Sequence, residues 1–255
     1  MFDRAQWFLA GMSIALSVQL SQPVAAAVSV SKVVQTAQTN SNDAAKKVFE
    51  EAQKLNQQGT ADSKRRAIVK FEQALKLYRE AGDHRGEALT LNNIGSVYSA
   101  LGEKQKALEY YSQSLSLSRA TGHRFGEAVT LNNIGSVYSA LGEKQKALEY
   151  YSQSLPLRRA VGDRSGEALT LYNMACVKRE QNNLTEALND IESSLKIIEN
   201  LRTNIASPEL RSSYFATMQE YYEFYIDLLM QLHKTNPNSG YDIKVSEASE
   251  RARTR

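Results

Sequence analysis

The sequence predicts an all-α solenoid of helical hairpins, and three observations indicate this fold class. The stretch TLNNIGSVYSALGEKQKALEYYSQSL occurs twice without a change, at 90–115 and 130–155. The blocks 81–120 and 121–160 match at 33 of 40 positions, so the repeat period is 40 residues. Apolar residues in each block recur at steps of three and four, the spacing of one helix face. Hairpins of this size cannot bury their apolar faces alone, so neighbouring copies must stack.

The first 27 residues have the layout of a secretory signal peptide. An apolar run from Trp7 to Leu20 follows Arg4, and the small residues 25–27 offer a cleavage site before Val28. The run is shorter than the roughly 20 residues that a membrane-spanning helix needs. We therefore predict export to the periplasm or the exterior, with no membrane contact after cleavage; an uncleaved anchor is the alternative. Residues 28–42 are expected to be a disordered linker.

Each 40-residue unit divides into two helices. In the second unit the first helix is predicted over 86–101, and Gly102 supplies the left-handed position that commonly ends a helix. A second helix then carries Ala107 and Tyr111 on its apolar face. Gly95 lies mid-helix, where glycine costs roughly 1 kcal/mol relative to alanine, which predicts the close approach of a neighbouring side chain. The array of about four such hairpins covers 43–201, with units at 43–80, 87–120, 127–160 and 167–201.

The apolar and small positions of these units resemble the tetratricopeptide (TPR) repeat family. Ser114 replaces the usual alanine and Arg119 the usual proline, and the 40-residue period is similar to the TPR arrays of kinesin light chains and spindle-orientation adaptors. The fourth hairpin has Ala175 and Lys178 at the glycine and tyrosine positions, so less regular packing is expected there. The matching residues are Leu91, Ile94, Gly95, Tyr98, Ala107 and Tyr111, and again Leu131, Ile134, Gly135, Tyr138, Ala147 and Tyr151.

The resemblance implies a non-enzymatic scaffold that holds a peptide or protein partner on a concave surface lined by the first helices. Asparagine amides there offer donors and an acceptor to a partner's backbone. The alternative is that the asparagines bond a neighbouring helix and the serines are solvated. Because the fourth hairpin breaks the pattern, specificity is expected in it. The candidate binding residues are Asn92, Asn93, Ser96, Ser99, Asn132, Asn133, Ser136, Ser139, Tyr172, Asn173 and Arg179.

Other chemistries find little support in the sequence. The family's carboxylate clamp needs Lys or Arg at inner positions, which here hold Ala, Asn and Ser. A net charge of +3, with both signs scattered, excludes a phosphate-tracking stripe, so nucleic acid is not an expected partner. The three histidines are not spaced as metal ligands, and Cys176 is alone. Phosphate-loop, nucleophile-elbow and zinc-protease motifs are missing from the sequence, so we expect neither a cofactor nor catalysis.

An aromatic helix is predicted at 207–234, followed by a linker at 235–240 and the start of a further helix at 241–255. One face of the aromatic helix is expected to cap the array, and the other to need a partner. The segment resembles the stretch that joins TPR arrays to the CHAT domain in bacterial TPR–CHAT proteins. That resemblance implies an alternative function, the regulatory module of a caspase-like CHAT protease whose catalytic domain is missing or separate. It also implies a candidate partner for the aromatic helix, a CHAT-domain protein. The aromatic residues are Tyr214, Phe215, Tyr221, Tyr222, Phe224 and Tyr225.

Overall fold

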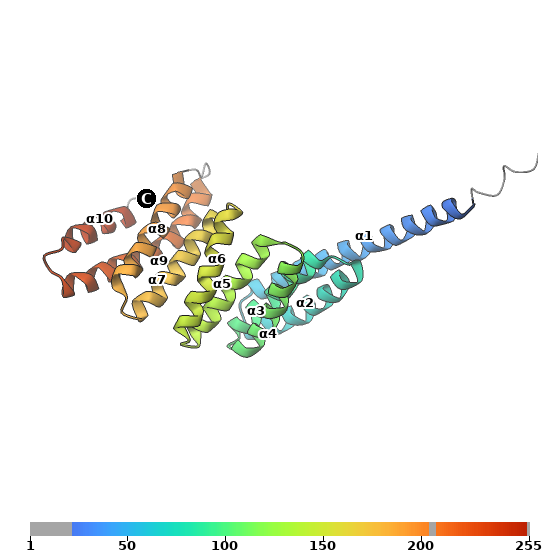
Figure 1. Ribbon diagram of the computed structural model, residues 1–255, viewed down its shortest axis with the longest axis horizontal. Helices are drawn as coiled ribbons and strands as arrows, with labels where there is room; N and C mark the ends of the chain where they lie inside the picture. Colours follow the sequence, from blue (N-terminus) through green and yellow to red (C-terminus); the bar gives the residue numbers. More distant parts are fainter. Residues whose placement is uncertain (1–21, 204–207, 254–255) are drawn as a thin grey trace, which may run out of the picture.

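A computed structural model of the chain describes residues 22–203 and 208–253, and every regular element in these ranges is an α-helix. The predicted all-α solenoid class is confirmed. The helices follow one another along the long axis of the molecule from α1 to α10 (Figure 1). Their bounds are α1 Gln22–Gln57, α2 Ala61–Ala81, α3 His84–Ala100, α4 Lys104–Ala120, α5 Arg124–Ala140, α6 Lys144–Ala160, α7 Arg164–Glu180, α8 Leu184–Thr203, α9 Pro208–Thr235 and α10 Tyr241–Arg253.

Left-handed residues separate the helices, as the sequence predicts. Gly102 has a φ of +82°, and Gly82 and Gly142 have φ values of +69° and +76°. At the equivalent position of the fourth hairpin the chain has Asn182, with a φ of +62°. Asparagine is among the few residues other than glycine that adopt this conformation readily. The turn geometry is therefore kept in a unit whose sequence has diverged.

Two interactions recur along the array, one between successive hairpins and one within each hairpin. Arg119 Nε donates to Glu127 Oε1 across 2.7 Å, and Arg79–Glu87 and Arg159–Glu167 repeat this pair at 2.6 and 2.7 Å. Within the second hairpin, the buried Ser114 hydroxyl donates to the carbonyl oxygen of Ala88 at 2.8 Å. In the next two hairpins, Ser154 donates to the carbonyl oxygen of Ala128 and Ser194 to that of Ala168. The serine that replaces the family's alanine thus satisfies a buried polar atom.

The fourth hairpin keeps its packing through paired changes. Tyr98 stacks on Tyr110 with ring centroids 5.4 Å apart, and Tyr138–Tyr150 repeats the stack. At the equivalent positions Lys178 Nζ lies 2.7 Å from Asp190 Oδ2, so an ion pair replaces two rings. Helix α7 has 17 residues, like α3 and α5. The less regular packing expected there is not visible in the length of this helix.

The N-terminal helix differs from the sequence-based expectation. Residues 28–42, expected to be a disordered linker, lie within α1. The stretch 24–58 contains neither proline nor glycine and includes several alanines, so nothing in it stops a helix. Residues 1–21, which hold most of the predicted signal peptide, lie outside the described residues. Within the described part, no helix is long and apolar enough to cross a membrane.

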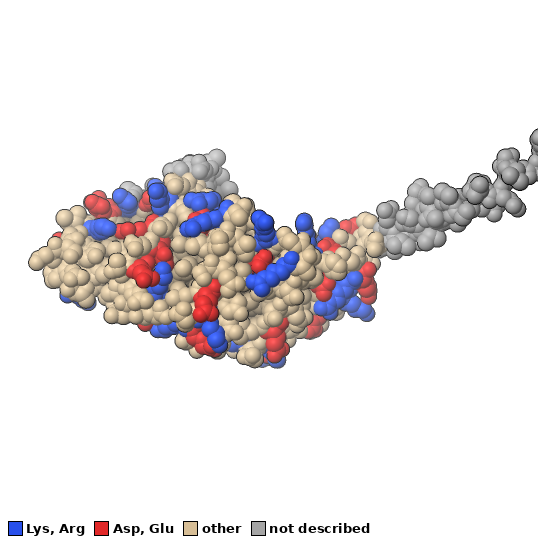
Figure 2. Space-filling view, viewed as in Figure 1, with Lys and Arg blue, Asp and Glu red and all other residues tan. Residues whose placement is uncertain are grey.

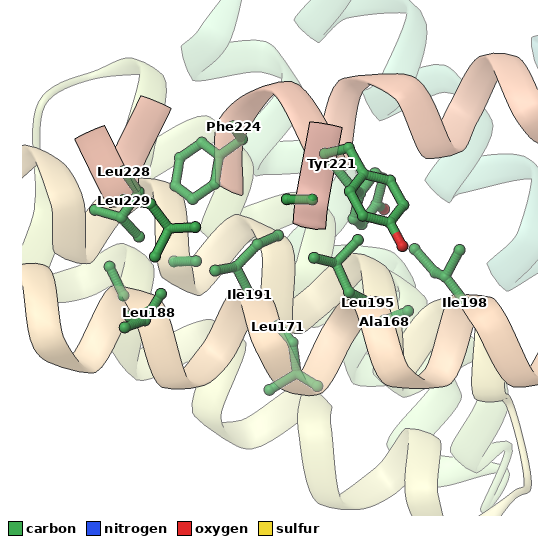
Figure 3. Close-up of a cluster of buried hydrophobic side chains, with 14 of the residues drawn as sticks. Ala168, Leu171, Leu188, Ile191, Leu195, Ile198, Tyr221, Phe224, Leu228 and Leu229 are labelled. Atoms are coloured by element: carbon green, nitrogen blue, oxygen red, sulfur yellow. The ribbon is translucent and has the colours of Figure 1, made fainter. Parts of the chain in front are cut away.

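Helices α9 and α10 occupy the position that a fifth hairpin would take. Leu228 and Leu229 of α9 are fully buried and face Leu188 and Ile191 of α8 (Figure 3). Helix α10 packs on α9 through Ala248, which is also buried. The expectation that one aromatic face lacks a partner was therefore wrong for Tyr221, Tyr222 and Phe224, which the chain itself buries. The side chains of Tyr214 and Phe215 lie outside the described part.

Candidate binding face on the first helices

Helices α3, α5 and α7 turn one face away from the core. On α3, Leu89, Asn93 and Ser96 lie at steps of three and four and share this face, opposite the fully buried Ile94. We call the equivalent positions on the three helices the first-helix face. Its members are Leu89, Asn93 and Ser96 of α3, Val129, Asn133 and Ser136 of α5, and Leu169, Asn173 and Cys176 of α7. Phe125 adjoins the face one turn before Val129, where α3 has Arg85 and α7 has Ser165.

Asn92 and Asn132 do not belong to this face. Both are buried between successive first helices, with exposures of 9% and 3%. Asn92 Nδ2 donates to Thr130 Oγ1 at 3.0 Å, and the Thr170 hydroxyl donates to Asn132 Oδ1 at 3.1 Å. Their prediction as groove residues is corrected, because a partner could reach these amides only by breaking contacts between repeats.

Asn93, Asn133 and Asn173 form the accessible amide row. Asn93 Nδ2 donates to the Leu89 carbonyl at 2.8 Å, and Asn133 Nδ2 donates to Asn92 Oδ1 at 3.2 Å. Asn173 Nδ2 donates in the same way to Asn132 Oδ1 at 3.3 Å. These bonds orient the three amides, and no carbonyl oxygen of the row accepts a hydrogen bond from another described residue. Each amide keeps that oxygen and one N–H for a partner.

The serines of the face are exposed and contact buried tyrosines. The Tyr151 hydroxyl donates to Ser136 Oγ at 3.2 Å, and Tyr111 bonds Ser96 equivalently. Burial raises the pKa of both tyrosines to about 12. Ser99 accepts from Lys104 Nζ at its carbonyl (3.0 Å) and hydroxyl (3.3 Å), so it lies beside a lysine at the end of α3. Ser139 is half-buried at the matching place on α5.

A row of exposed apolar side chains runs beside the amide row, and the sequence analysis missed it. Leu89 is 51% exposed and Leu169 is 40% exposed. Val129 stands at the equivalent position of α5 and is half-buried, and Phe125, one turn before it, is 49% exposed. Leu89 and Leu169 each lie one helical turn before an asparagine of the amide row. The signal was present in the sequence, since Leu89 falls outside the buried stripe of its own helix when positions are plotted at 100° per residue.

Two predicted binding residues of the fourth hairpin are covered by α9. The Tyr172 ring lies 4.3 Å from that of Tyr221, and its hydroxyl donates to Glu220 at 3.0 Å. Arg179 stacks over the Phe224 ring at 4.3 Å. Both side chains therefore hold the C-terminal helices in place. The expectation that they contact an external partner conflicts with this geometry.

Cys176 remains at the edge of the face as an unreactive thiol. Burial raises its pKa to about 11, so the thiol stays protonated at neutral pH. A protonated, partly buried thiol is neither a good nucleophile nor a metal ligand. In the described part of the chain no three His, Cys, Asp or Glu side chains come together as they would to hold a metal ion.

A separate cavity of about 290 Å³ lies between α8, α9 and α10. Its charged groups are largely paired with one another: Lys244 Nζ and the Tyr225 hydroxyl donate to Glu192 Oε1 at 2.9 and 3.0 Å. The Tyr222 hydroxyl donates to Glu199. These bonds join the three helices, and the cavity presents both signs of charge without a dominant one.

Charged side chains of both signs alternate over the molecular face shown in Figure 2, with uncharged areas between them. No large area of a single sign is visible on that face. This distribution agrees with a net charge of +3 and offers no track for a polyanion.

The comparisons with known proteins define the class of protein. A tetratricopeptide repeat family model matches residues 62–120 and 123–200, more than half of the chain. The chain therefore belongs to the tetratricopeptide repeat family. No curated protein matched it.

Several solved structures share the fold. BtubC (BKLC) from P. vanneervenii is 19% identical, with 84% of this chain and 89% of that chain covered and a TM-score of 0.53. A putative kinesin light chain of Podosopora anserina with nearly identical TPR-like repeats is 15% identical, with 84% and 99% covered and a TM-score of 0.59.

The Rap protein complexed with Competence and Sporulation Factor is 17% identical, with 80% of this chain and 52% of that chain covered and a TM-score of 0.59. This chain thus spans about half of the Rap structure. At these identities the likeness of all three structures shows the fold alone.

Proposed function

We propose that this protein is an interaction scaffold that holds a segment of a partner protein on the first-helix face. The observation that carries this proposal is the amide row. Asn93 is oriented by a bond within its own helix, and Asn133 and Asn173 are oriented by bonds to the preceding first helix. No described residue donates a hydrogen bond to the side-chain carbonyl oxygens of the three asparagines. TPR proteins typically act as non-catalytic scaffolds, and the similar Rap protein was solved with a bound factor. Both points support a role in binding a partner protein over a role in catalysis.

The test is affinity capture from a native extract with the wild-type chain and an Asn93→Ala/Asn133→Ala variant. We expect the variant to lose the partner that the wild type retains, because each substitution removes one amide from the row. Gln113→Ala is the matched control: Gln113 lies on α4 and makes the same kind of bond to the carbonyl four residues earlier. An unchanged set of captured proteins in the Asn variant would overturn the proposal.

Export remains part of this proposal. A protein purified from its native source should begin at Val28 if the predicted signal is cleaved, and mass spectrometry of the mature N-terminus checks this. The packed part of α1 begins further on, at the fully buried Ala45 and the buried Phe49. Removal of 1–27 is therefore compatible with the fold of the array.

A sensor role within a larger assembly is the second candidate. A solved signal-transduction ATPase with a tetratricopeptide repeat sensor, from Pyrococcus horikoshii, is 18% identical to this chain, with 80% of this chain and 30% of that chain covered and a TM-score of 0.61. By analogy this array would carry a signal to a catalytic protein such as a CHAT protease. Because Tyr221, Tyr222 and Phe224 of α9 are buried, such a partner would have to contact exposed apolar side chains of α9 and α10, which are Met230 and Ile243. Co-purification lost on Ile243→Ser would support it, and retention would exclude this contact.

A further inference from the structure

The first-helix face carries two parallel rows with the same period. Leu89, Val129 and Leu169 form an apolar row, and each lies four residues before an asparagine of the amide row. Four helical residues span about 6 Å, so the two rows run side by side about one turn apart. A partner that follows one row therefore meets the other along its whole length.

Neither row contains a charged side chain. The nearest ionisable positions in the same register are Arg85, one turn before Leu89, and Glu180, one turn after Cys176. A charged side chain of the partner that lay on the two rows would lose contact with water without gaining a neighbour of opposite charge, which is unfavourable. The charge pattern therefore selects a neutral segment with apolar side chains.

The spacing of the rows sets the conformation of that segment. Asn133 bonds Asn92 and Asn173 bonds Asn132, so successive first helices are in direct contact. The axes of packed helices lie about 8–10 Å apart. A polyproline II helix has three residues per turn and rises 3.1 Å per residue, so every third residue repeats at about 9 Å on one face.

The alternative conformations fit the rows less well. In a β-strand, residues three apart point to opposite faces. In an α-helix the spacing is met at every seventh residue, at about 10.5 Å, but the backbone N–H groups are bonded internally and cannot reach the amide row. A polyproline II backbone has no internal hydrogen bonds and presents free N–H and C=O groups. It satisfies the spacing and the amides together.

We infer that the partner segment is an uncharged peptide in the polyproline II conformation, with an aliphatic side chain at every third position that packs on Leu89, Val129 and Leu169 while its backbone bonds Asn93, Asn133 and Asn173. This inference rests on the proposed function and deepens it. It names the chemistry of the partner, which the amide row alone leaves open.

The test uses three labelled synthetic peptides and fluorescence anisotropy. The first repeats Leu-Pro-Gln four times, since proline fixes its own φ and keeps the preceding residue extended. The second has the same composition with its leucines contiguous. The third is an Ala- and Gln-rich helix with leucine at every seventh position. We expect the first to bind at least tenfold more tightly than the other two.

The Leu89→Ser/Leu169→Ser variant should weaken binding of the first peptide by at least tenfold, which corresponds to about 1.4 kcal/mol. Val69→Ser is the matched control, because Val69 is 54% exposed on a second helix, α2. Since all three residues are about half exposed, the variants should fold, and circular dichroism checks this. Equal binding of the leucine-clustered peptide, tighter binding of the helical peptide, or an equal effect of Val69→Ser would overturn the inference.

The two proposals can fail separately. If the native partner depends on Asn93 and Asn133 but the Leu-Pro-Gln peptide neither binds nor competes with it, the polyproline II inference fails and the scaffold function stands. If the captured proteins are unaffected by the Asn variant and the peptide does not bind, both fail.

Discussion

The ring of Tyr111 occupies the space next to Gly95 that a Cβ atom would need. A Cβ built on Gly95 would lie 2.7 Å from Tyr111 Cδ1, closer than van der Waals contact allows. The same relationship joins Gly135 to Tyr151. In the fourth hairpin the equivalent positions hold Ala175 and Ile191, both fully buried. Glycine faces tyrosine and alanine faces isoleucine, so the volumes of the two positions are matched within each hairpin.

Gly95→Ala should lower the free energy of unfolding by about 1–3 kcal/mol, because the buried ring has to shift. Alanine's higher helix propensity, worth about 1 kcal/mol, offsets only part of this cost. The double variant Gly95→Ala/Tyr111→Ile copies the pair of the fourth hairpin. It should recover part of the lost stability, and urea unfolding measures both variants. Additive losses in the double variant would show that the two positions are not coupled.

His123→Asp should stabilise the protein by about 0.5–2 kcal/mol. Asp83 and Asp163 cap α3 and α7 by accepting from the N–H of Gly86 and Gly166, each at 2.9 Å. His123 occupies the same position before α5 without a capping bond, and its buried Nδ1 has no hydrogen-bond partner. The measurement is the thermal midpoint. Asp83→His is the reverse change and should lower it, so a shift of the same sign in both variants would refute the capping explanation.

Alkaline pH should destabilise the chain, and Tyr111 and Tyr151 should account for part of the loss. Both side chains are 2% exposed, and burial raises the pKa of each from 10.0 to about 12. The pKa of each tyrosine is higher in the folded chain than in the unfolded chain. The contribution of the buried, protonated tyrosines to the free energy of unfolding is therefore complete below pH 10. It is lost as pH rises toward 12, by roughly 1.4 kcal/mol per pH unit for each tyrosine. Urea unfolding at pH 8, 10.5 and 11.5 tests the slope.

Tyr111→Phe/Tyr151→Phe is the control for that slope, since it keeps the rings and removes the ionisable groups. The variant should be less stable at pH 8 by about 0.5–1.5 kcal/mol for each hydrogen bond lost to Ser96 and Ser136. Its stability should then fall less steeply above pH 10. A slope equal to that of the wild type would assign the alkaline loss to other groups.

Deletion of residues 90–129 should leave a folded protein that is one hairpin shorter. The deletion joins Leu89 to Thr130, and the identical stretches 90–115 and 130–155 place the same side chains at the new junction. Circular dichroism should show a loss of helix in proportion to the number of residues deleted. The free energy of unfolding should fall by the contributions of one hairpin and of one interface between hairpins. Deletion of 104–123 removes one helix of a pair and should prevent cooperative unfolding.

The local sequence was sufficient for the helical units and their apolar faces. The left-handed Gly102 and the close approach at Gly95 were predictable from residues of the same hairpin, and the structure shows both of them. The distinction between asparagines was not predictable from the same information. Asn92 and Asn93 are adjacent and alike in the sequence. Only the position of α5 buries Asn92 against Thr130 and leaves Asn93 partly accessible.

The sequence by itself determined the repeated hairpins, because helix periodicity and turn residues act over short distances along the chain. The tertiary structure decided which polar groups remain for a partner. Asn132 accepts a hydrogen bond from Thr170, which is 38 residues away, and Tyr172 donates one to Glu220, which is 48 residues away. Such bonds depend on how whole helices stack, which periodicity does not encode. For the same reason the stacking of α8, α9 and α10 buries Tyr221, Tyr222 and Phe224, for which the sequence alone left a further partner to be expected.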